Sequence, residues 1–212
     1  MHWFYYIGRV ITWLLLMLFA RWQVHGRENV PPGGPLLIVA NHISLADPPV
    51  IGLSIRRRMQ FMAKEELFRA RYTSYFIRHY GTFPVKRRGL NRRTLELAEA
   101  WLAAGNALVM FPEGGRSPDN RLQPAFPGTA LLAGKLGAPI LPVGITGTEV
   151  VTGLGKWMLR RPVIRLNIGP VFTLPDKKPD RDDLQHYTNI IMEHIAALLP
   201  AERRGSYTGK TS

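Results

Sequence analysis

The chain has 212 residues, enough for one ordinary domain, and its 46% hydrophobic and 20% charged residues are typical of a globular core. Twenty-eight basic residues oppose 15 acidic ones, and the formal net charge of +13 favours anionic partners: nucleic acid, a membrane surface or a phosphorylated substrate. The lack of cysteine excludes disulfides, cysteine metal ligands and thiol nucleophiles. The six histidines show no metalloprotease or zinc-finger spacing, so we expect no metal site.

The first 30 residues predict a helical segment at a membrane interface. Residues 10–20 form an eleven-residue, mainly apolar run that would be about 16 Å long as a helix. This is roughly half of a ~30 Å hydrocarbon core, so we do not expect the run to cross a bilayer. Aromatic residues and the flanking Arg9 and Arg21 match a monotopic helix in the headgroup region. The alternative is a soluble helix buried in the core.

Residues 31–200 alternate strand and helix patterns after a Pro-Gly turn cluster. Strands are predicted at 36–40, 59–63, 82–85, 107–111, 140–145 and 163–168, and helices at 92–104, 128–136 and 184–199. Pro142 indicates that its strand is an edge strand, carries a bulge or ends there. The order predicts one α/β domain, a mixed β-sheet flanked by helices. Residues 201–212 are interpreted as a flexible tail.

The basic residues are concentrated in one stretch. Between Arg56 and Arg93, twelve basic residues oppose only Glu65 and Glu66, so 38 residues carry +10 of the net charge. Any one of them is expected on a solvated face. Ten net charges interleaved with aromatic residues, however, suit either a nucleic-acid surface or a membrane interface.

The loop after the first buried strand carries the first candidate site. Chemistry in α/β sheets gathers past the carboxyl ends of strands, and His42 and Asp47 follow residues 36–40 directly. Asp47-Pro48 fits a helix N-cap followed by proline at the first helical position, so the carboxylate can face back toward His42. A carboxylate on one imidazole nitrogen makes the other a general base for a hydroxyl. Taken singly, Asp47 also fits a plain helix cap and His42 a hydrogen-bonded loop histidine.

A second candidate loop follows the strand at 107–111. Gly114 and Gly115 stand between Glu113 and Arg116, so backbone can approach a ligand closely and the guanidinium can fork onto a phosphate. The simpler alternative is an ordinary Gly-Pro turn. Arg87 lies at a predicted strand end inside the basic stretch and, taken alone, would be a surface residue.

Four motifs in this order resemble the glycerolipid acyltransferase family, in particular the 1-acylglycerol-3-phosphate acyltransferases. The first, Asn-His-x-Ser-x-x-Asp, is matched by Asn41, His42, Ser44 and Asp47; the second by Gly81 and Arg87; the third by Phe111, Pro112, Glu113, Gly114, Arg116 and Ser117; the fourth by residues 139–143. The resemblance covers roughly residues 35–170. Two departures, Gly115 where the family has Thr and the lack of a Lys near Gln123, bear on acceptor identity more than on reaction type.

The resemblance implies direct acyl transfer to the sn-2 hydroxyl of a lysophospholipid, giving phosphatidic acid. In this reading His42, oriented by Asp47, is the general base, and Ser44 is structural. The acceptor and its phosphate would be bound by Lys86, Arg87, Glu113, Gly114 and Arg116. Acyl-coenzyme A or acyl-carrier protein would be the co-substrate, and no cofactor is expected.

The expected location is the cytoplasmic face of the cell membrane, on an anionic surface, and no nucleic-acid partner is expected. One alternative is an acyltransferase for another lysolipid. The alternative from a different class is a non-catalytic basic protein that binds membranes or nucleic acid.

Overall fold

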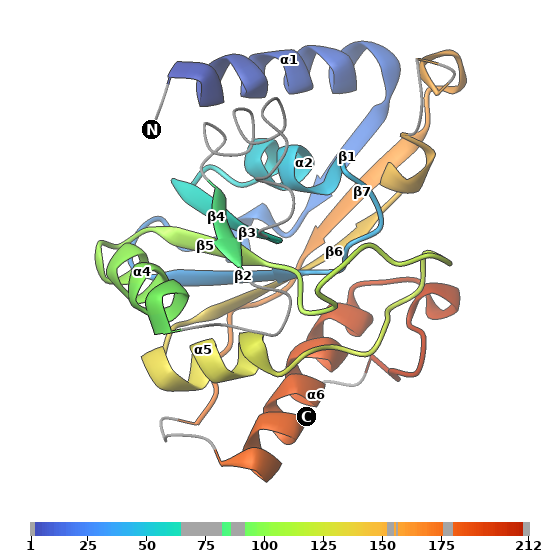
Figure 1. Cartoon of the computed structure of the whole chain (residues 1–212). Helices are drawn as coiled ribbons and strands as arrows, with labels where there is room; N and C mark the ends of the chain where they lie inside the picture. The colour runs from blue at the N-terminus through green and yellow to red at the C-terminus, as the bar shows by residue number, and fades with distance from the viewer. Residues whose placement is uncertain are drawn as a thin grey trace.

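A computed structural model describes residues 3–64, 82–85, 92–151, 155, 157–175 and 180–209 (Figure 1). Among these residues, seven strands form one sheet in the order β1-β7-β6-β2-β5-β3-β4. The strands are β1 (Arg21–His25), β2 (Leu36–Ala40), β3 (Met59–Lys64), β4 (Thr82–Val85), β5 (Ala107–Met110), β6 (Ile140–Thr146) and β7 (Val163–Ile168). Only β6 and β7 pair antiparallel; the other neighbouring strands are parallel.

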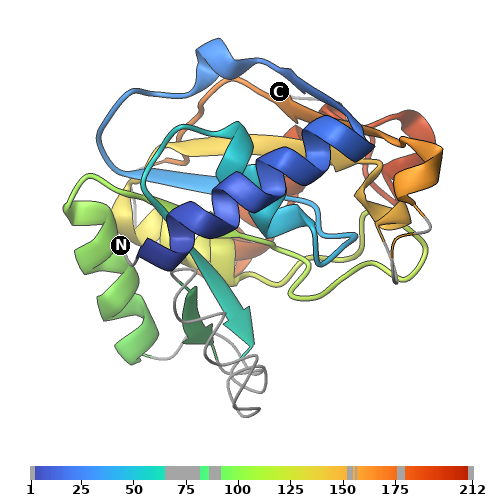
Figure 2. The same cartoon turned by 90° about the horizontal axis from the view of Figure 1, so that it is seen from above.

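Helices cover both faces of the sheet (Figures 1 and 2). The α-helices are α1 (Trp3–Phe19), α2 (Asp47–Ser54), α4 (Arg92–Ala103), α5 (Gly128–Leu136) and α6 (Arg181–Ala197). Short 3-10 turns are η1 (Arg27–Asn29), η3 (Thr148–Val150), η4 (Met158–Arg160) and η5 (Ala201–Arg203). The predicted α/β class, a mixed sheet flanked by helices, is confirmed.

The central strands are buried on both faces because helices pack on each side. Leu36 and Ile38 of β2 face one apolar cluster together with α1 and α2, whereas Leu37 and Val39 face a second cluster with α4, α5 and α6. All five residues of β2 are fully buried. This explains why its sequence is a continuous apolar run and not an alternating one.

The first 30 residues are helical as predicted in α1, but the predicted helical segment is wrong for the residues after it. The helix ends at Phe19, and residues 21–25 form β1, which pairs with β7 at the edge of the sheet. The sequence Arg-Trp-Gln-Val-His alternates exposed and half-buried positions, as an edge strand does, but it is short and polar enough to resemble a helix flank.

Pro142 lies in an interior strand, between β7 and β2, so the edge-strand alternative is wrong. Val143 pairs with Ile168 and Ile140 bridges to Phe172. Two residues of β6 therefore oppose the three residues 169–171, and this is a β-bulge. The bulge accommodates a proline that has no N–H for the β7 ladder.

Part of the predicted tail contacts the domain. Arg203 accepts the backbone N–H of Leu122 on its carbonyl oxygen at 2.9 Å and pairs with Glu149 at 2.7 Å. Further along, the hydroxyl of Thr208 lies 3.0 Å from the carboxylate of Glu193 on α6. The described part of the tail, residues 201–209, therefore packs against the domain.

Arg57, one of the twelve basic residues, is structural and not part of a solvated face. Its side chain is buried, and its guanidinium donates to the carbonyl oxygens of Pro31, Gly33, Gly34 and Gly105. Arg57 thereby connects the turn before β2 to the turn before β5. Burial lowers the pKa of its guanidinium.

Candidate active site

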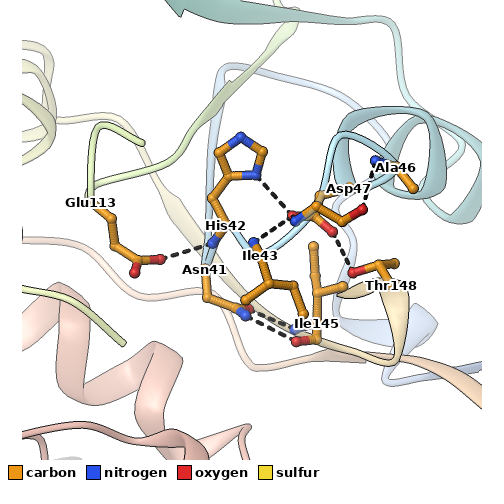
Figure 3. A network of polar contacts seen from close by, with 9 residues as sticks. Asn41, His42, Ile43, Ala46, Asp47, Glu113, Ile145 and Thr148 are labelled. Atoms are coloured by element: carbon orange, nitrogen blue, oxygen red, sulfur yellow. Dashed lines mark hydrogen bonds and ion pairs between the residues drawn. The ribbon is translucent and has the colours of Figure 1, made fainter. Parts of the chain in front are cut away.

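The site lies at one edge of the sheet, where three neighbouring strands end. His42 follows β2, Phe111 follows β5 and Thr148 follows β6. Both β5 and β6 pair with β2 in parallel, so their carboxyl ends meet at the same edge. Figure 3 shows the side chains from these loops converging on the His42–Asp47 pair.

His42 and Asp47 form the predicted pair. His42 Nδ1 lies 2.8 Å from Asp47 Oδ2, and the exposed side-chain fractions are 16% for the histidine and 0% for the aspartate. Because Nδ1 is engaged by the carboxylate, Nε2 is the ring nitrogen left to face a substrate. This geometry is that of a general base with a carboxylate that orients it.

The local reason for the pair differs from the predicted helix cap. The N-cap of α2 is Ala46, and Asp47 is the first helical residue, with no side-chain cap bond from the N-cap. The carboxylate turns back over the preceding loop, where Oδ2 accepts the backbone N–H groups of Ile43 at 2.7 Å and Ser44 at 2.8 Å. The loop thus wraps around the carboxylate and brings His42 to it.

Thr148 is a contact of Asp47 that the sequence reasoning missed. Its hydroxyl donates to Asp47 Oδ1 at 2.6 Å, and both residues are fully buried. Gly147 has φ 87°, and a Cβ there would lie 2.0 Å from the carbonyl oxygen of Val163, so this turn requires glycine. The position just past β6, at the same sheet edge, is the signal that could have indicated Thr148.

The Phe111–Ser117 loop holds the backbone of His42 from the other side. Glu113 Oε1 accepts the N–H of His42 at 2.8 Å, and the N–H of Ser117 donates to the carbonyl oxygen of His42 at 2.7 Å. The ring of Phe111 stacks on the imidazole, with centroids 4.2 Å apart and planes 21° from parallel. The imidazole is therefore fixed through its backbone, its Nδ1 and its ring face.

Glu113 is buried beneath this loop, where its second oxygen accepts the N–H of Gln123 at 2.9 Å. Burial raises the pKa of the Glu113 carboxyl to about 7, although the two backbone N–H groups oppose the rise and the charge of Asp47 adds to it. In the structure Glu113 contacts the backbone of His42 and does not face the open surface.

The motif residues Asn41 and Ser44 lie in the same network. The Asn41 side chain donates to the carbonyl oxygen of Ile145 at 2.9 Å and accepts its N–H at 2.7 Å, which extends the β2–β6 pairing by one side chain. Ser44 is buried, and its hydroxyl oxygen accepts the N–H of Ala46 at 3.2 Å. Ser44 therefore makes a hydrogen bond within its own loop, as expected of a structural residue.

The predicted phosphate-binding residues are placed only in part. Arg116 is exposed on the loop that carries Glu113. Gly114 has φ 64°, and its N–H donates to the carbonyl oxygen of Phe111 at 3.0 Å, so that amide is already used within the turn. Lys86 and Arg87 lie outside the described residues, as do Gly81 and most of the basic stretch. Within the described ranges, no cluster of three or more His, Asp or Glu side chains is arranged to hold a metal ion.

Comparison with known proteins identifies the family of this chain. Residues 21–146 match the family model described as Acyltransferase. The 1-acyl-sn-glycerol-3-phosphate acyltransferase of Bacillus subtilis is 24% identical over 87% of this chain and 92% of its own length. The chloroplast enzyme BAT2 of Brassica napus, with the same activity in its name, is 28% identical over 72% of this chain and 45% of its own length. The chain spans about half the length of the curated relatives from Brassica napus and Chlamydomonas reinhardtii.

A solved structure has the same fold. The crystal structure of the 1-acyl-sn-glycerophosphate acyltransferase from Thermotoga maritima superposes with a TM-score of 0.66 at 30% identity, covering 87% of this chain and 74% of that one. The family match covers more than half of the chain and includes His42, Asp47, Glu113 and Arg116. This chain belongs to the acyltransferase family.

Proposed function

We propose that this protein transfers a fatty acyl group to the free sn-2 hydroxyl of 1-acylglycerol-3-phosphate and so forms phosphatidic acid. The observation that carries the proposal is the buried Asp47 carboxylate 2.8 Å from Nδ1 of a partly exposed His42. The names of the Bacillus subtilis and Thermotoga maritima relatives support the same acceptor.

In the proposed reaction, Nε2 of His42 takes the proton from the acceptor hydroxyl as its oxygen attacks the thioester carbonyl of the donor. A C–O bond forms, the C–S bond breaks, and the imidazolium returns the proton to the leaving thiolate. Asp47 fixes the tautomer of the neutral imidazole and then stabilises the imidazolium. No acyl-enzyme is needed, since the hydroxyl of Ser44 is buried in a loop contact.

The acceptor's phosphate is assigned to the cationic side of the site. Arg116 is exposed and directly precedes Ser117, whose N–H donates to the carbonyl oxygen of His42, and a guanidinium binds phosphate with two parallel hydrogen bonds. Lys86 and Arg87 are proposed to add further charge. Glu113 is proposed to act by holding the loop, because its two oxygens already accept the N–H groups of His42 and Gln123.

Membrane association is part of the proposal. Along α1, seven large apolar side chains are exposed: Ile7, Val10, Ile11, Trp13, Leu14, Met17 and Leu18. Among the described helices, none is long and apolar enough to cross a membrane. An apolar helix face with arginines nearby is typical of a segment lying in the headgroup region, on the cytoplasmic face in this proposal. A membrane position gives access to an acceptor that resides there.

The donor is proposed to be acyl-coenzyme A or acyl-carrier protein, the thioesters that the reaction requires. Another lysolipid acceptor remains the alternative within the same chemistry. A non-catalytic basic binder is disfavoured by the His42 environment, because a surface for charge alone does not need a buried carboxylate with four hydrogen-bonding partners.

The test is a panel assay with purified protein on mixed vesicles, in which acyl-coenzyme A is supplied with one lysolipid at a time. We expect lysophosphatidate to give the highest kcat/KM and lysophosphatidylcholine or lysophosphatidylethanolamine to be at least tenfold poorer. A best acceptor that lacks the phosphomonoester of lysophosphatidate would refute the assignment of Arg116. If acyl-coenzyme A gives no turnover, the same panel is repeated with acyl-carrier protein as the donor. Inactivity with both donors would refute the proposed acyl transfer.

A further inference from the structure

We propose that the protein meets an anionic bilayer through two segments, α1 and the turn formed by η4 with Arg160 and Arg161. This inference rests on the proposed membrane association and adds a second contact to it. The two segments are far apart in sequence but adjacent in the fold. The η4 turn, residues 158–160, lies beside the carboxyl-terminal end of α1, at the top right of Figure 1 and at the right of Figure 2.

A ring contact joins the two segments. Trp157, directly before η4, is buried, and its indole packs edge-on against Phe19 at the end of α1, with centroids 6.4 Å apart. The position of η4 relative to α1 is therefore set by packing between side chains. A membrane surface in contact with the outer face of α1 would come close to η4 as well.

Leu159 is the apolar side chain that this turn exposes. It is 91% exposed, the largest value among the exposed large apolar side chains of the described residues. Its neighbour Met158 is half-buried, so the turn directs one leucine outward while its flank packs on the domain. A single exposed leucine is common on soluble proteins. Leu159, however, lies beside the exposed apolar face of α1, so one membrane surface can contact both.

The charges next to Leu159 match an anionic lipid surface. Arg160 and Arg161 follow it directly and are exposed. Arg21, exposed at the start of β1, donates its N–H to the carbonyl oxygen of Pro162 at 2.8 Å, which places a third arginine at this corner. Arginines that flank an apolar tip can extend their charges to lipid phosphates while the tip enters the headgroup region. Because of this positive charge, an anionic bilayer is a better binding partner for this corner than an apolar groove on another protein.

The backbone at Arg161 is also unusual. It has φ 42°, in the left-handed region that residues with a side chain rarely adopt, and it connects η4 to β7. Glycine would adopt this conformation without cost, yet an arginine stands there. An exposed cation in a strained turn is consistent with a role for its side chain.

The experiment uses the fact that the chain has no cysteine, so one introduced thiol can carry one environment-sensitive dye. Leu159→Cys, Val10→Cys on α1 and Leu97→Cys on α4 are each labelled with NBD and mixed with phosphatidylcholine–phosphatidylglycerol vesicles. Leu97 is the control, since it is 46% exposed on the opposite side of the sheet. We expect a blue shift and brighter emission at positions 159 and 10 and no change at 97.

The outcomes separate the two proposals. A shift at 10 without a shift at 159 overturns the second contact and leaves membrane association standing. No shift at any position overturns both. Unlabelled Arg160→Ala/Arg161→Ala protein gives an independent measure: we expect vesicle partitioning to weaken at least fivefold at low salt and much less at high salt. Partitioning equal to that of the wild type would overturn the role of the two arginines.

Discussion

The two halves of the candidate site are built in opposite ways. On the base side, Asp47 is fully buried, and its two oxygens are held by His42, Ile43, Ser44 and Thr148. On the acceptor side, Arg116 is exposed. In the proposed reaction, the proton-transfer residues are therefore preorganised by the fold, whereas the phosphate contact of Arg116 forms when the acceptor arrives.

This contrast has a kinetic consequence. Disturbing a preorganised base removes an interaction that operates in the transition state, and this lowers kcat. Removing an exposed cation weakens acceptor binding, and this raises KM.

Asp47→Asn should lower kcat about 100-fold with little change in KM. An asparagine can keep its oxygen toward the N–H groups of Ile43 and Ser44 while its amide faces Thr148, so the shape persists and the charge that stabilises the imidazolium is lost. Steady-state kinetics with lysophosphatidate, alongside circular dichroism to verify folding, measure the effect. A folded variant with wild-type kcat would contradict the role of the carboxylate.

Thr148→Val should lower kcat about tenfold, because Asp47 Oδ1 loses its donor in a fully buried place. Thr148→Ser keeps the hydroxyl and is expected to restore most of the activity. Thr148 acts through Asp47, so the pH profile of kcat/KM should shift in the valine variant and not in the serine variant. Identical pH profiles for all three proteins would reduce Thr148 to a packing residue.

Arg116→Ala should raise the KM for lysophosphatidate about tenfold while kcat changes less than twofold, as expected for the loss of one charge-assisted phosphate contact. Arg121→Ala is the matched control, since Arg121 is also exposed and lies five positions along the same loop segment. Equal effects of the two substitutions would show a general charge effect and not a phosphate site.

Glu113 should make stability depend on pH. Its pKa is raised from 4.5 to about 7, so between these values the folded protein binds more protons than the unfolded chain, and stability falls as pH rises. The difference between wild type and Glu113→Gln in urea unfolding should therefore change by up to about 1.4 kcal/mol per pH unit in that window. A constant difference from pH 4.5 to 7 would mean that the pKa of Glu113 is not raised.

Much of the fold could be predicted because most strands carry apolar residues, in continuous runs or in alternation with polar ones, between turns. β2, β4 and β7 have the predicted bounds, as does α5. β1 could not be found in the same way. Its five residues are mostly polar, and what makes them a strand is parallel pairing with β7, about 140 positions away in sequence.

In the site, too, the contacts between residues close in sequence could be predicted, and the contacts between distant residues could not. The His42–Asp47 pair was predicted because both residues lie on one short loop, where proline and a helix start limit the geometry. The Thr148 contact and the bond from His42 N–H to Glu113 join residues 101 and 71 positions apart. Such contacts depend on which strands are neighbours in the sheet, and a strand pattern alone does not give that order.

The most direct test of the account is His42→Ala, assayed on vesicles with lysophosphatidate at equal amounts of bound protein. We expect phosphatidate formation to fall about 1,000-fold while vesicle binding is unchanged, because the base is lost and α1 is untouched. Turnover within tenfold of the wild type would contradict the assignment of His42 as the base.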